Sequence, residues 1–311
     1  MSTVLCLGDS CADVIIPYGD LLEHKDVRAY FECGGAGANS AAALGKLNVD
    51  TAFAGKAGKD LYGITMKKEL ETHFVDTTHF ILAEDLVSTQ VLVVIDENRD
   101  RHTFLMPKDE PSYLEIYKDD LDDIDLSDTE YILTNGMMLF RNPAAENITD
   151  FLIKAHEKGI KILLDINYRI ETIGQDRTYL DKVVEISDHL LGSITDDFLP
   201  LTGKDTMDEA ADALLKEGKT IVARDSSGST VYTSGNRYHC DSFKVEVADT
   251  LGAGDAFNAG YIYGLVRGHD LRGSNIRGCA AAALCINKTG ARNTPYESEL
   301  LSFLIKRLIS L

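Results

Sequence analysis

The 311-residue sequence has few cysteines, a shortage of basic residues and no long apolar segment. Its six cysteines are scattered without a C-x-x-C pair, which argues against a disulfide framework or a zinc site and favours a reducing cytosol. Only 31 Lys and Arg residues stand against 50 Asp and Glu residues, so the net charge is −19. Such an acidic surface argues against nucleic acids and anionic membranes as partners. Without a basic N-terminal segment or a long apolar run, we expect neither a signal peptide nor a transmembrane helix, and a cytoplasmic location.

Several familiar catalytic signatures are missing as well. The chain has no zincin motif, no Walker A loop and no catalytic Ser–His pair, and its eight histidines show no ligand spacing. Because the surface is acidic, any phosphate site must be built locally from backbone N–H groups, a few cations and a metal ion.

The composition is that of a globular protein, with 44% hydrophobic and 26% charged residues, enough for the core of one large domain. Short apolar strands are predicted at residues 4–7, 14–16, 29–32, 51–54, 131–134, 161–165, 188–192 and 220–223. Helices are predicted from near residue 39 and at 62–72, 144–158, 179–187, 207–217 and 298–311. Alternating runs at 78–82, 89–96 and 102–106 indicate a hairpin-rich sheet. The later strand–helix alternation predicts an α/β fold with a mainly parallel sheet covered on both faces, and ligands at the carboxyl ends of its strands.

One stretch stands out, DTLGAGDAFNAGYIYG, residues 249–264. The small residues Gly252, Ala253 and Gly254 lead directly into an apolar helical pattern. Such a turn leaves backbone N–H groups free at a helix N-terminus, where they attract an anion. Asp255 stands beside this anion site, where a carboxylate is useful if it handles a proton, so the pattern predicts a phosphotransferase. The alternative is an ordinary helix start, with Asp255 as a first-turn acid.

DTLGAGD resembles the second signature of the ribokinase-like (PfkB) carbohydrate kinases, D-T-x-G-A-G-D, at every fixed position. The resemblance implies that Asp255 is the catalytic base and that the backbone of Gly252, Ala253 and Gly254 forms the anion hole. It covers nearly the whole chain and implies a three-layer α/β/α core plus a small β-sheet lid. We therefore expect a single domain, residues 1–311, with a discontinuous lid from about 13–33 and 76–106. The resemblance also allows a homodimer through the lid.

The sugar side is implied by GGAGANSAAALGKL, residues 34–47, which resembles the family's first signature, G-G-x-x-x-N-x-A. Gly34, Gly35 and Asn39 match it, and an amide both donates and accepts toward a diol. The alternative for Asn39 is a helix N-cap. Ribokinases usually carry Lys where this chain has Ala36, which argues against ribose.

Two acids follow the first strand in GDSCAD, residues 8–13. In the family the acid equivalent to Asp13 binds sugar hydroxyls, whereas the plainer interpretation is an exposed acid on an edge strand. Asp9 either shares that work or satisfies the turn. Arg101, Phe104 and Lys108 are further candidate substrate contacts from the lid.

DINYR, residues 165–169, resembles fructokinases and 2-keto-3-deoxygluconate kinases more than ribokinases. Asn167 is placed near metal and phosphate, and Arg169 is placed to meet a phosphate or a substrate carboxylate. The alternative is a surface arginine paired with Glu171 or Asp176.

The metal and nucleotide residues carry weaker patterns. Ser193 and Asp196 occupy the positions of the family's N-x-x-E segment, which organises Mg²⁺ through waters, and Asp197 is a second candidate. NKTGARNT, residues 287–294, resembles the segment that closes the adenine pocket and implies a contact from Asn287. A K⁺ site is implied at these residues: Asp249, Thr250, Gly290 and Thr294.

After the strand at 220–223 the usual family text is T-x-G-x-x-G, whose first Gly lies against the nucleotide phosphates. Gly228 keeps the second glycine, but Asp225 replaces the first. A carboxylate beside a triphosphate is unfavourable. We therefore expect Asp225 to turn outward onto the N–H of Ser227 or Gly228, and Arg224 to face the phosphates.

Together these patterns predict ATP-dependent, Mg²⁺-dependent phosphorylation of a primary hydroxyl on a small sugar or sugar acid of the fructose, 2-keto-3-deoxygluconate or ribose type. The expected nucleotide contacts are Ser193, Arg224, Gly228, Gly254 and Asn287. One alternative is a nucleoside kinase of the same fold. The other is a regulatory protein that binds sugar or nucleotide without turnover, against which the intact Asp255 argues.

Overall fold

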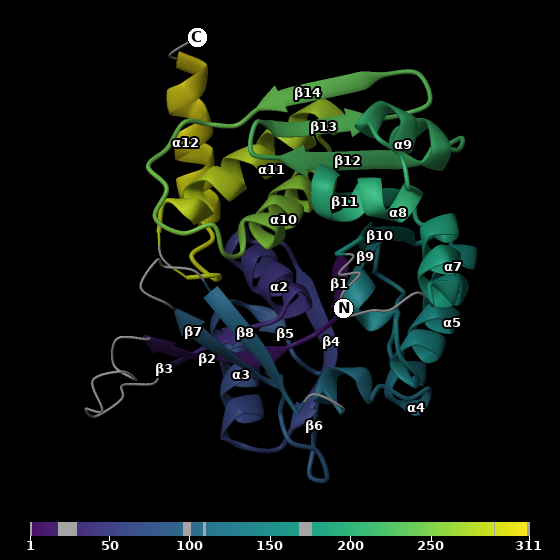
Figure 1. The fold of residues 1–311 in the computed structure, drawn as a ribbon, viewed down its shortest axis with the longest axis vertical. Coiled ribbons are helices and arrows are strands. Elements are labelled where there is room, and N and C mark those ends of the chain that lie inside the picture. Colours follow the sequence, from purple (N-terminus) through teal and green to yellow (C-terminus); the bar gives the residue numbers. More distant parts are fainter. Residues whose placement is uncertain are drawn as a thin grey trace.

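The computed structural model describes residues 2–17, 30–95, 101–107, 110–167, 176–288 and 290–309. In these ranges the chain forms a large sheet between two layers of helices and a separate small sheet (Figure 1). No helix within them combines the length and the apolar character needed to cross a bilayer. All six cysteines lie in the described ranges and are free thiols.

The large sheet runs in the order β14-β13-β12-β11-β10-β9-β1-β4-β5 within the described residues, and β6 also pairs with β4. Its strands are β1 (Val4–Leu7), β4 (Thr51–Gly58), β5 (Val75–Asp76), β6 (Phe80–Ala83), β9 (Tyr131–Asn135), β10 (Lys161–Asp165), β11 (His189–Ser193), β12 (Thr220–Asp225), β13 (Gly228–Tyr232) and β14 (Arg237–Asp241). The pairings from β5 to β12 are parallel, and β12, β13 and β14 are antiparallel. The predicted mainly parallel sheet is therefore confirmed.

Successive residues of the central strands contribute to two separate hydrophobic cores, as the two-residue period of a strand requires. In β1, Cys6 belongs to one core and Leu7 to the other. The first core is covered by α2 (Ala36–Lys46), α3 (Leu61–Thr72), α10 (Ala253–Val266), α11 (Leu271–Ile286) and α12 (Glu297–Ile309). The second is covered by α4 (Asp119–Asp122), α5 (Ala144–Glu157), α7 (Thr178–Ile186), α8 (Leu199–Thr202) and α9 (Met207–Leu214). The described residues also include the short helical turns η1 (Ser112–Leu114), η2 (Gly136–Met138) and η3 (Ile194–Phe198).

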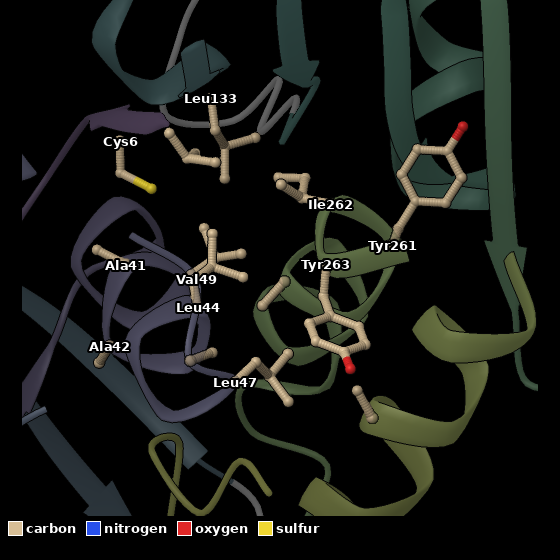
Figure 2. Packing of buried hydrophobic residues seen from close by; sticks show 14 of the residues in the cluster. Cys6, Ala41, Ala42, Leu44, Leu47, Val49, Leu133, Tyr261, Ile262 and Tyr263 are labelled. Carbon is tan, nitrogen blue, oxygen red and sulfur yellow. The ribbon is translucent and has the colours of Figure 1, made fainter. Parts of the chain in front are cut away.

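The two signature helices, α2 and α10, pack directly against each other. Figure 2 shows Leu44, Leu47 and Val49 near Ile262 and Tyr263 in the space between these helices. The N-termini of both helices consequently reach the same edge of the large sheet.

The small sheet has the order β3-β2-β7-β8, with β2 (Cys11–Pro17), β3 (Tyr30–Gly34), β7 (Gln90–Ile95) and β8 (Arg101–Met106). It lies beside α2 and α3, far from β12–β14 (Figure 1). Part of the expected lid range belongs elsewhere, because β5 and β6 pair with β4 of the large sheet. An alternating apolar strand can join either sheet, and only the strand with which it pairs determines the sheet to which it belongs.

Candidate active site

A cavity of about 640 Å³ opens at the carboxyl edge of the large sheet. Its wall includes Asp9 after β1, Asp165 at the end of β10 and Arg224 near the end of β12. The N-terminus of α10 forms the floor, and the small sheet contributes the side chains of Asp13 and Leu105. The volume suits a small ligand plus a phosphate group. The cavity therefore lies at the carboxyl ends of the strands, where the strand–helix alternation predicts ligands.

The Gly-Ala-Gly turn lines this cavity at the start of α10. Gly252 is the N-cap residue with φ of 75°, a conformation that glycine adopts without strain. A Cβ there would lie 2.1 Å from the carbonyl oxygen of Ala291, so close packing also demands glycine. The N–H of Ala253 donates to the carbonyl oxygen of Thr250 at 3.3 Å. The first N–H groups of a helix have no acceptor one turn earlier in the helix, and they carry the positive end of its dipole. The turn can therefore bind an anion.

Asp255 follows in the first turn of α10 and lines the cavity. Its Oδ2 accepts a hydrogen bond of 3.0 Å from Nδ2 of Asn39. Burial raises the pKa of Asp255 to about 8; the hydrogen bond from Asn39 and the charge of Arg224 lower it, and the charges of Asp165 and Asp9 raise it. A carboxylate with such a pKa is basic enough to accept a proton from a hydroxyl as it reacts.

Asn39 lies in the interior of α2, which begins at Ala36 with Gly35 as its N-cap. The alternative that Asn39 caps this helix is therefore wrong, and the helix starts three residues earlier than expected. Both ends of the Asn39 amide are bound, because Oδ1 accepts a hydrogen bond of 2.9 Å from Nε of Arg292. Gly35 lines the cavity as well.

Asp9 and Asp13 have different surroundings. The Asp9 carboxylate accepts from the backbone N–H groups of Ala36 and Gly37, at 3.1 and 3.0 Å, and so satisfies the start of α2. Asp13 lies on β2, an inner strand of the small sheet, and faces the cavity. The alternative of an exposed acid on an edge strand is therefore wrong. Burial raises the pKa of Asp13 to about 6. A Cβ on Gly34 would lie 2.6 Å from an Asp13 oxygen, so this glycine lets the carboxylate fit.

The outward turn of Asp225 is confirmed. Its Oδ1 accepts hydrogen bonds from the N–H groups of Ser227 (2.8 Å) and Gly228 (3.2 Å) and from the Ser227 hydroxyl (2.6 Å). These bonds, the hydroxyl first, hold the pKa of Asp225 below its usual value.

Arg224 reaches the cavity, but its guanidinium is bound to protein acceptors. It donates to the carbonyl oxygen of Gly254 (3.0 Å), to Oδ1 of Asn258 and to Oδ1 of Asp165 (3.0 Å). Nδ2 of Asn258 in turn donates to Oδ2 of Asp165 at 2.8 Å. This network fixes the carbonyl side of the anion-binding turn.

The candidate metal residues separate in space. Asp197 is buried, lines the cavity and accepts a hydrogen bond of 2.6 Å from the N–H of Ser193. Asp196 is exposed and lies outside the cavity wall. Asn167 lines the cavity with φ of 38°. Carboxylate and amide oxygens around a phosphate-sized space fit Mg²⁺, which keeps most of its waters.

Three of the expected nucleotide contacts, Gly228, Ser193 and Asn287, do not line the cavity. Gly228 is buried in the β12–β13 hairpin, and the Ser193 hydroxyl accepts from the N–H of Asp196 at 3.3 Å. Asn287 donates to the carbonyl oxygen of Glu246 at 2.9 Å. Their contact with a nucleotide remains a prediction.

The proposed K⁺ segments do come together. Asp249 and Thr250 line the cavity, and Oδ2 of Asp249 accepts a hydrogen bond of 3.1 Å from the N–H of Gly290. The hydroxyl of Thr294 is buried and has no hydrogen-bond partner among the described residues. These oxygens suit a monovalent cation in chemistry. Arg169 lies outside the described residues, as does Lys108.

Phe104 points away from the cavity, because its neighbour Leu105 lines it. The sequence patterns predict no role for Asn258 or Arg292, although Asn258 lies in the stretch 249–264 and Arg292 in the stretch 287–294. Their contacts run to Asp165 and Asn39, which are distant in sequence. No local pattern therefore marks them.

Comparison with known proteins agrees with this geometry. A model of the pfkB family carbohydrate kinases matches residues 1–298. A 5-dehydro-2-deoxygluconokinase from Bacillus subtilis is 25% identical, over 97% of this chain and 95% of its own. A candidate ribokinase II from E. coli, in complex with ATP and Mg²⁺, is 22% identical with a TM-score of 0.86, covering 98% of this chain and 100% of its own. A fructokinase double mutant from Vibrio cholerae, with fructose, ADP and potassium ion bound, is 24% identical with a TM-score of 0.82 and covers 98% of each chain.

Proposed function

Because the chain belongs to the pfkB family of carbohydrate kinases, we propose that it transfers the γ-phosphoryl group of ATP to a primary hydroxyl of a small sugar acid, with Asp255 as the general base. One observation carries the mechanism: the Asp255 carboxylate and the N-terminus of α10 lie in the wall of the same cavity. A base and an anion site side by side are what phosphoryl transfer to an alcohol needs.

In this mechanism the ionised Asp255 accepts the hydroxyl proton as the sugar oxygen attacks the γ-phosphorus. The bond from the γ-phosphorus to the bridging oxygen breaks, and ADP leaves. The N–H groups of Gly252, Ala253 and Gly254 stabilise the negative charge on the transferring group. A Cβ on Gly254 would meet Arg224 at an ordinary 3.7 Å, so no protein atom crowds this part of the turn. Bound Mg²⁺ would neutralise phosphate charge, with Asp197 and Asn167 as its nearest candidate holders and Asp196 as a more remote one.

The sugar would bind on the small-sheet side of the cavity, against Asp13, Gly35 and Asn39. The same face of the small sheet also carries apolar side chains beside Asp13, namely Ile15, Val91, Val93 and Leu105. A substrate that carries both hydroxyls and a deoxygenated carbon fits such a mixed polar and apolar surface. The relatives named 5-dehydro-2-deoxygluconokinase act on a sugar acid of this kind by name. We therefore place a deoxy keto sugar acid first, with Arg169 as the candidate partner of its carboxylate.

A coupled ADP-release screen tests the substrate class. The panel should contain 5-dehydro-2-deoxygluconate, 2-keto-3-deoxygluconate, fructose, tagatose 6-phosphate, ribose, adenosine and pseudouridine. We expect a sugar acid or a hexulose to give a higher kcat/KM than ribose. A value for ribose at least as high as for every other compound would overturn this assignment. Preference for adenosine or pseudouridine would point to a nucleoside kinase.

We also propose that the outer face of the small sheet pairs with a second copy of the chain. Val14, Leu92 and Phe104 lie in register across three strands, on the face opposite the cavity. Phe104 is 54% exposed, which is unfavourable for an aromatic side chain in water. Light scattering should give a dimer mass for the wild type and a monomer mass for Phe104→Glu. Ile305→Glu, at an exposed apolar site on α12, is the control. A monomeric wild type would refute the pairing.

A further inference from the structure

Arg292 lies behind the cavity, with a side chain only 8% exposed. Its Nε donates to Oδ1 of Asn39 at 2.9 Å, and one terminal nitrogen donates to Oε2 of Glu69 at 2.8 Å. The other terminal nitrogen donates to the carbonyl oxygen of Gly34 at 3.3 Å. One guanidinium thus contacts two residues of the GGAGAN motif and a carboxylate of α3.

The Arg292 contact fixes the orientation of the Asn39 amide. A guanidinium can only donate hydrogen bonds, so the amide oxygen of Asn39 must face Arg292. The amide nitrogen then faces Asp255, to which it donates at 3.0 Å. If the amide turned over, its oxygen would face the carboxylate, and only the protonated Asp255 could donate to it.

We propose that Arg292 is a positioning residue: by holding the oxygen of the Asn39 amide, it keeps an N–H donor on the carboxylate of Asp255. The inference rests on the proposed role of Asp255 as the general base. Arg292 acts on the base through Asn39, since it donates to Asn39, Glu69 and Gly34.

The balance at Asp255 explains why one donor matters. Asp9, after β1, and Asp165, on β10, face it as negative charges, and Arg224, on β12, faces it as a positive charge. The thiol of Cys285 on α11 is also within its electrostatic reach, with a pKa raised to about 11, mainly by burial, and so is neutral. Burial and two carboxylates thus oppose ionisation, and Arg224 and Asn39 favour it. Loss of the Asn39 donor should leave Asp255 protonated over a wider pH range.

Glu69 holds Arg292 in place. Burial alone would raise the pKa of the Glu69 carboxyl, but the His73 hydrogen bond and the Arg292 charge outweigh it and lower the pKa to about 2. Glu69 is therefore a carboxylate at neutral pH, and its ion pair with Arg292 is largely buried. Removing Arg292 alone would leave an uncompensated buried charge, which is strongly destabilising.

The test titrates Asp255 directly, by NMR of the protein labelled with ¹³C at the aspartate carboxyl carbons. Asp255→Asn identifies the resonance. The key variant is Glu69→Gln/Arg292→Met, which removes both charges, and Glu69→Gln alone is its matched control because it keeps the Arg292 donors. We expect the double variant to raise the Asp255 midpoint by about 1 pH unit, as for the loss of one hydrogen bond to a carboxylate. Glu69→Gln alone should move it much less.

The route through Asn39 has its own control. In an Asn39→Ala background, the same double substitution should add no further shift. Arg267→Met, which removes an arginine paired with Glu297 at 3.0 Å, should leave the midpoint unchanged. If the double variant does not fold, Arg292→Lys keeps a cation beside Glu69 but cannot serve three acceptors at once, and it should give a smaller upward shift.

An unchanged midpoint in the double variant overturns the proposal, as does an equal shift in Glu69→Gln alone or a full shift in the Asn39→Ala background. This titration needs no turnover. A protein that shows the shift but phosphorylates nothing on the panel would refute the kinase assignment and leave the positioning role standing. An active kinase that does not show the shift would refute the positioning role and leave the kinase assignment standing.

Discussion

Arg224 donates a 3.0 Å hydrogen bond to the carbonyl oxygen of Gly254, which ties the end of β12 to the anion-binding turn at the start of α10. The same terminal nitrogen donates to Oδ1 of Asn258, and the other terminal nitrogen donates to Oδ1 of Asp165 at 3.0 Å. Because its guanidinium already has three protein acceptors, we expect Arg224 mainly to support the turn rather than to bind phosphate alone.

Arg224→Ala should lower kcat by about 10-fold or more, because the turn that stabilises the transferring group loses its support. The KM for ATP should also rise, since one positive charge leaves the phosphate region. The neighbouring variant Asp225→Gly is the control and should change the KM for ATP little, because Asp225 binds only its own loop. Unchanged kinetics in Arg224→Ala, or a large rise in KM in Asp225→Gly, would contradict this assignment.

The pH dependence of kcat/KM should follow the ionisation of Asp255. Burial raises its pKa to about 8, and the base acts only when ionised, so activity should increase as the pH rises through about 8. Asp13, with a pKa raised to about 6 by burial, should add a smaller effect at lower pH. Initial rates from pH 5 to 9 at low sugar concentration measure the profile. A rate already constant above pH 6 would show that Asp255 is not the group that limits it.

Asp255→Asn should stabilise the folded protein increasingly as the pH rises from 5 to 8. The folded pKa lies above the unfolded value of about 3.9, so between these values the unfolded chain binds fewer protons and wild-type stability falls as the pH rises. Asparagine has no charge to bury and avoids this loss. Thermal melts at pH 5 and 8 should show a gap of a few degrees that widens at the higher pH. A gap that is constant with pH would contradict the raised pKa.

Metal dependence follows from the oxygen-rich wall of the cavity. Activity should be lost in excess chelator and restored by Mg²⁺, and Asp197→Asn should raise the Mg²⁺ requirement more than Asp196→Asn. Asp197 is buried in the wall, whereas Asp196 is exposed. Potassium should stimulate activity by binding near Asp249 and Thr294. Equal rates in sodium-only and potassium buffers would contradict this predicted cation site. Full activity in excess chelator would contradict the predicted dependence on Mg²⁺.

The sequence was informative wherever a local motif decided the structure. The strands β1 and β10 have the predicted bounds, and Gly252 and Asp255 lie at the start of a helix, as the DTLGAGD pattern predicted. The outward turn of Asp225 was also predictable, because an Asp two residues before Ser227 can bond to its N–H without any distant partner.

Contacts between distant segments were not predictable in the same way. Arg292 reaches Asn39 across 253 residues, and no pattern near either residue records this contact. The choice between Asp196 and Asp197 depends on the π-helical turn η3, whose wider winding changes which side chain faces inward. The small sheet was placed too broadly because β6 has the apolar pattern of a strand but pairs with β4.

The most direct test of the central claim is the rate of ADP release by the wild type and by Asp255→Asn, with the best panel substrate at saturation and equal folded protein. Asparagine keeps the shape of the side chain and loses its basicity, so kcat should fall by about 100-fold to 10,000-fold while ATP and sugar still bind. A variant that retains more than about a tenth of the wild-type kcat would contradict the assignment of Asp255 as the base.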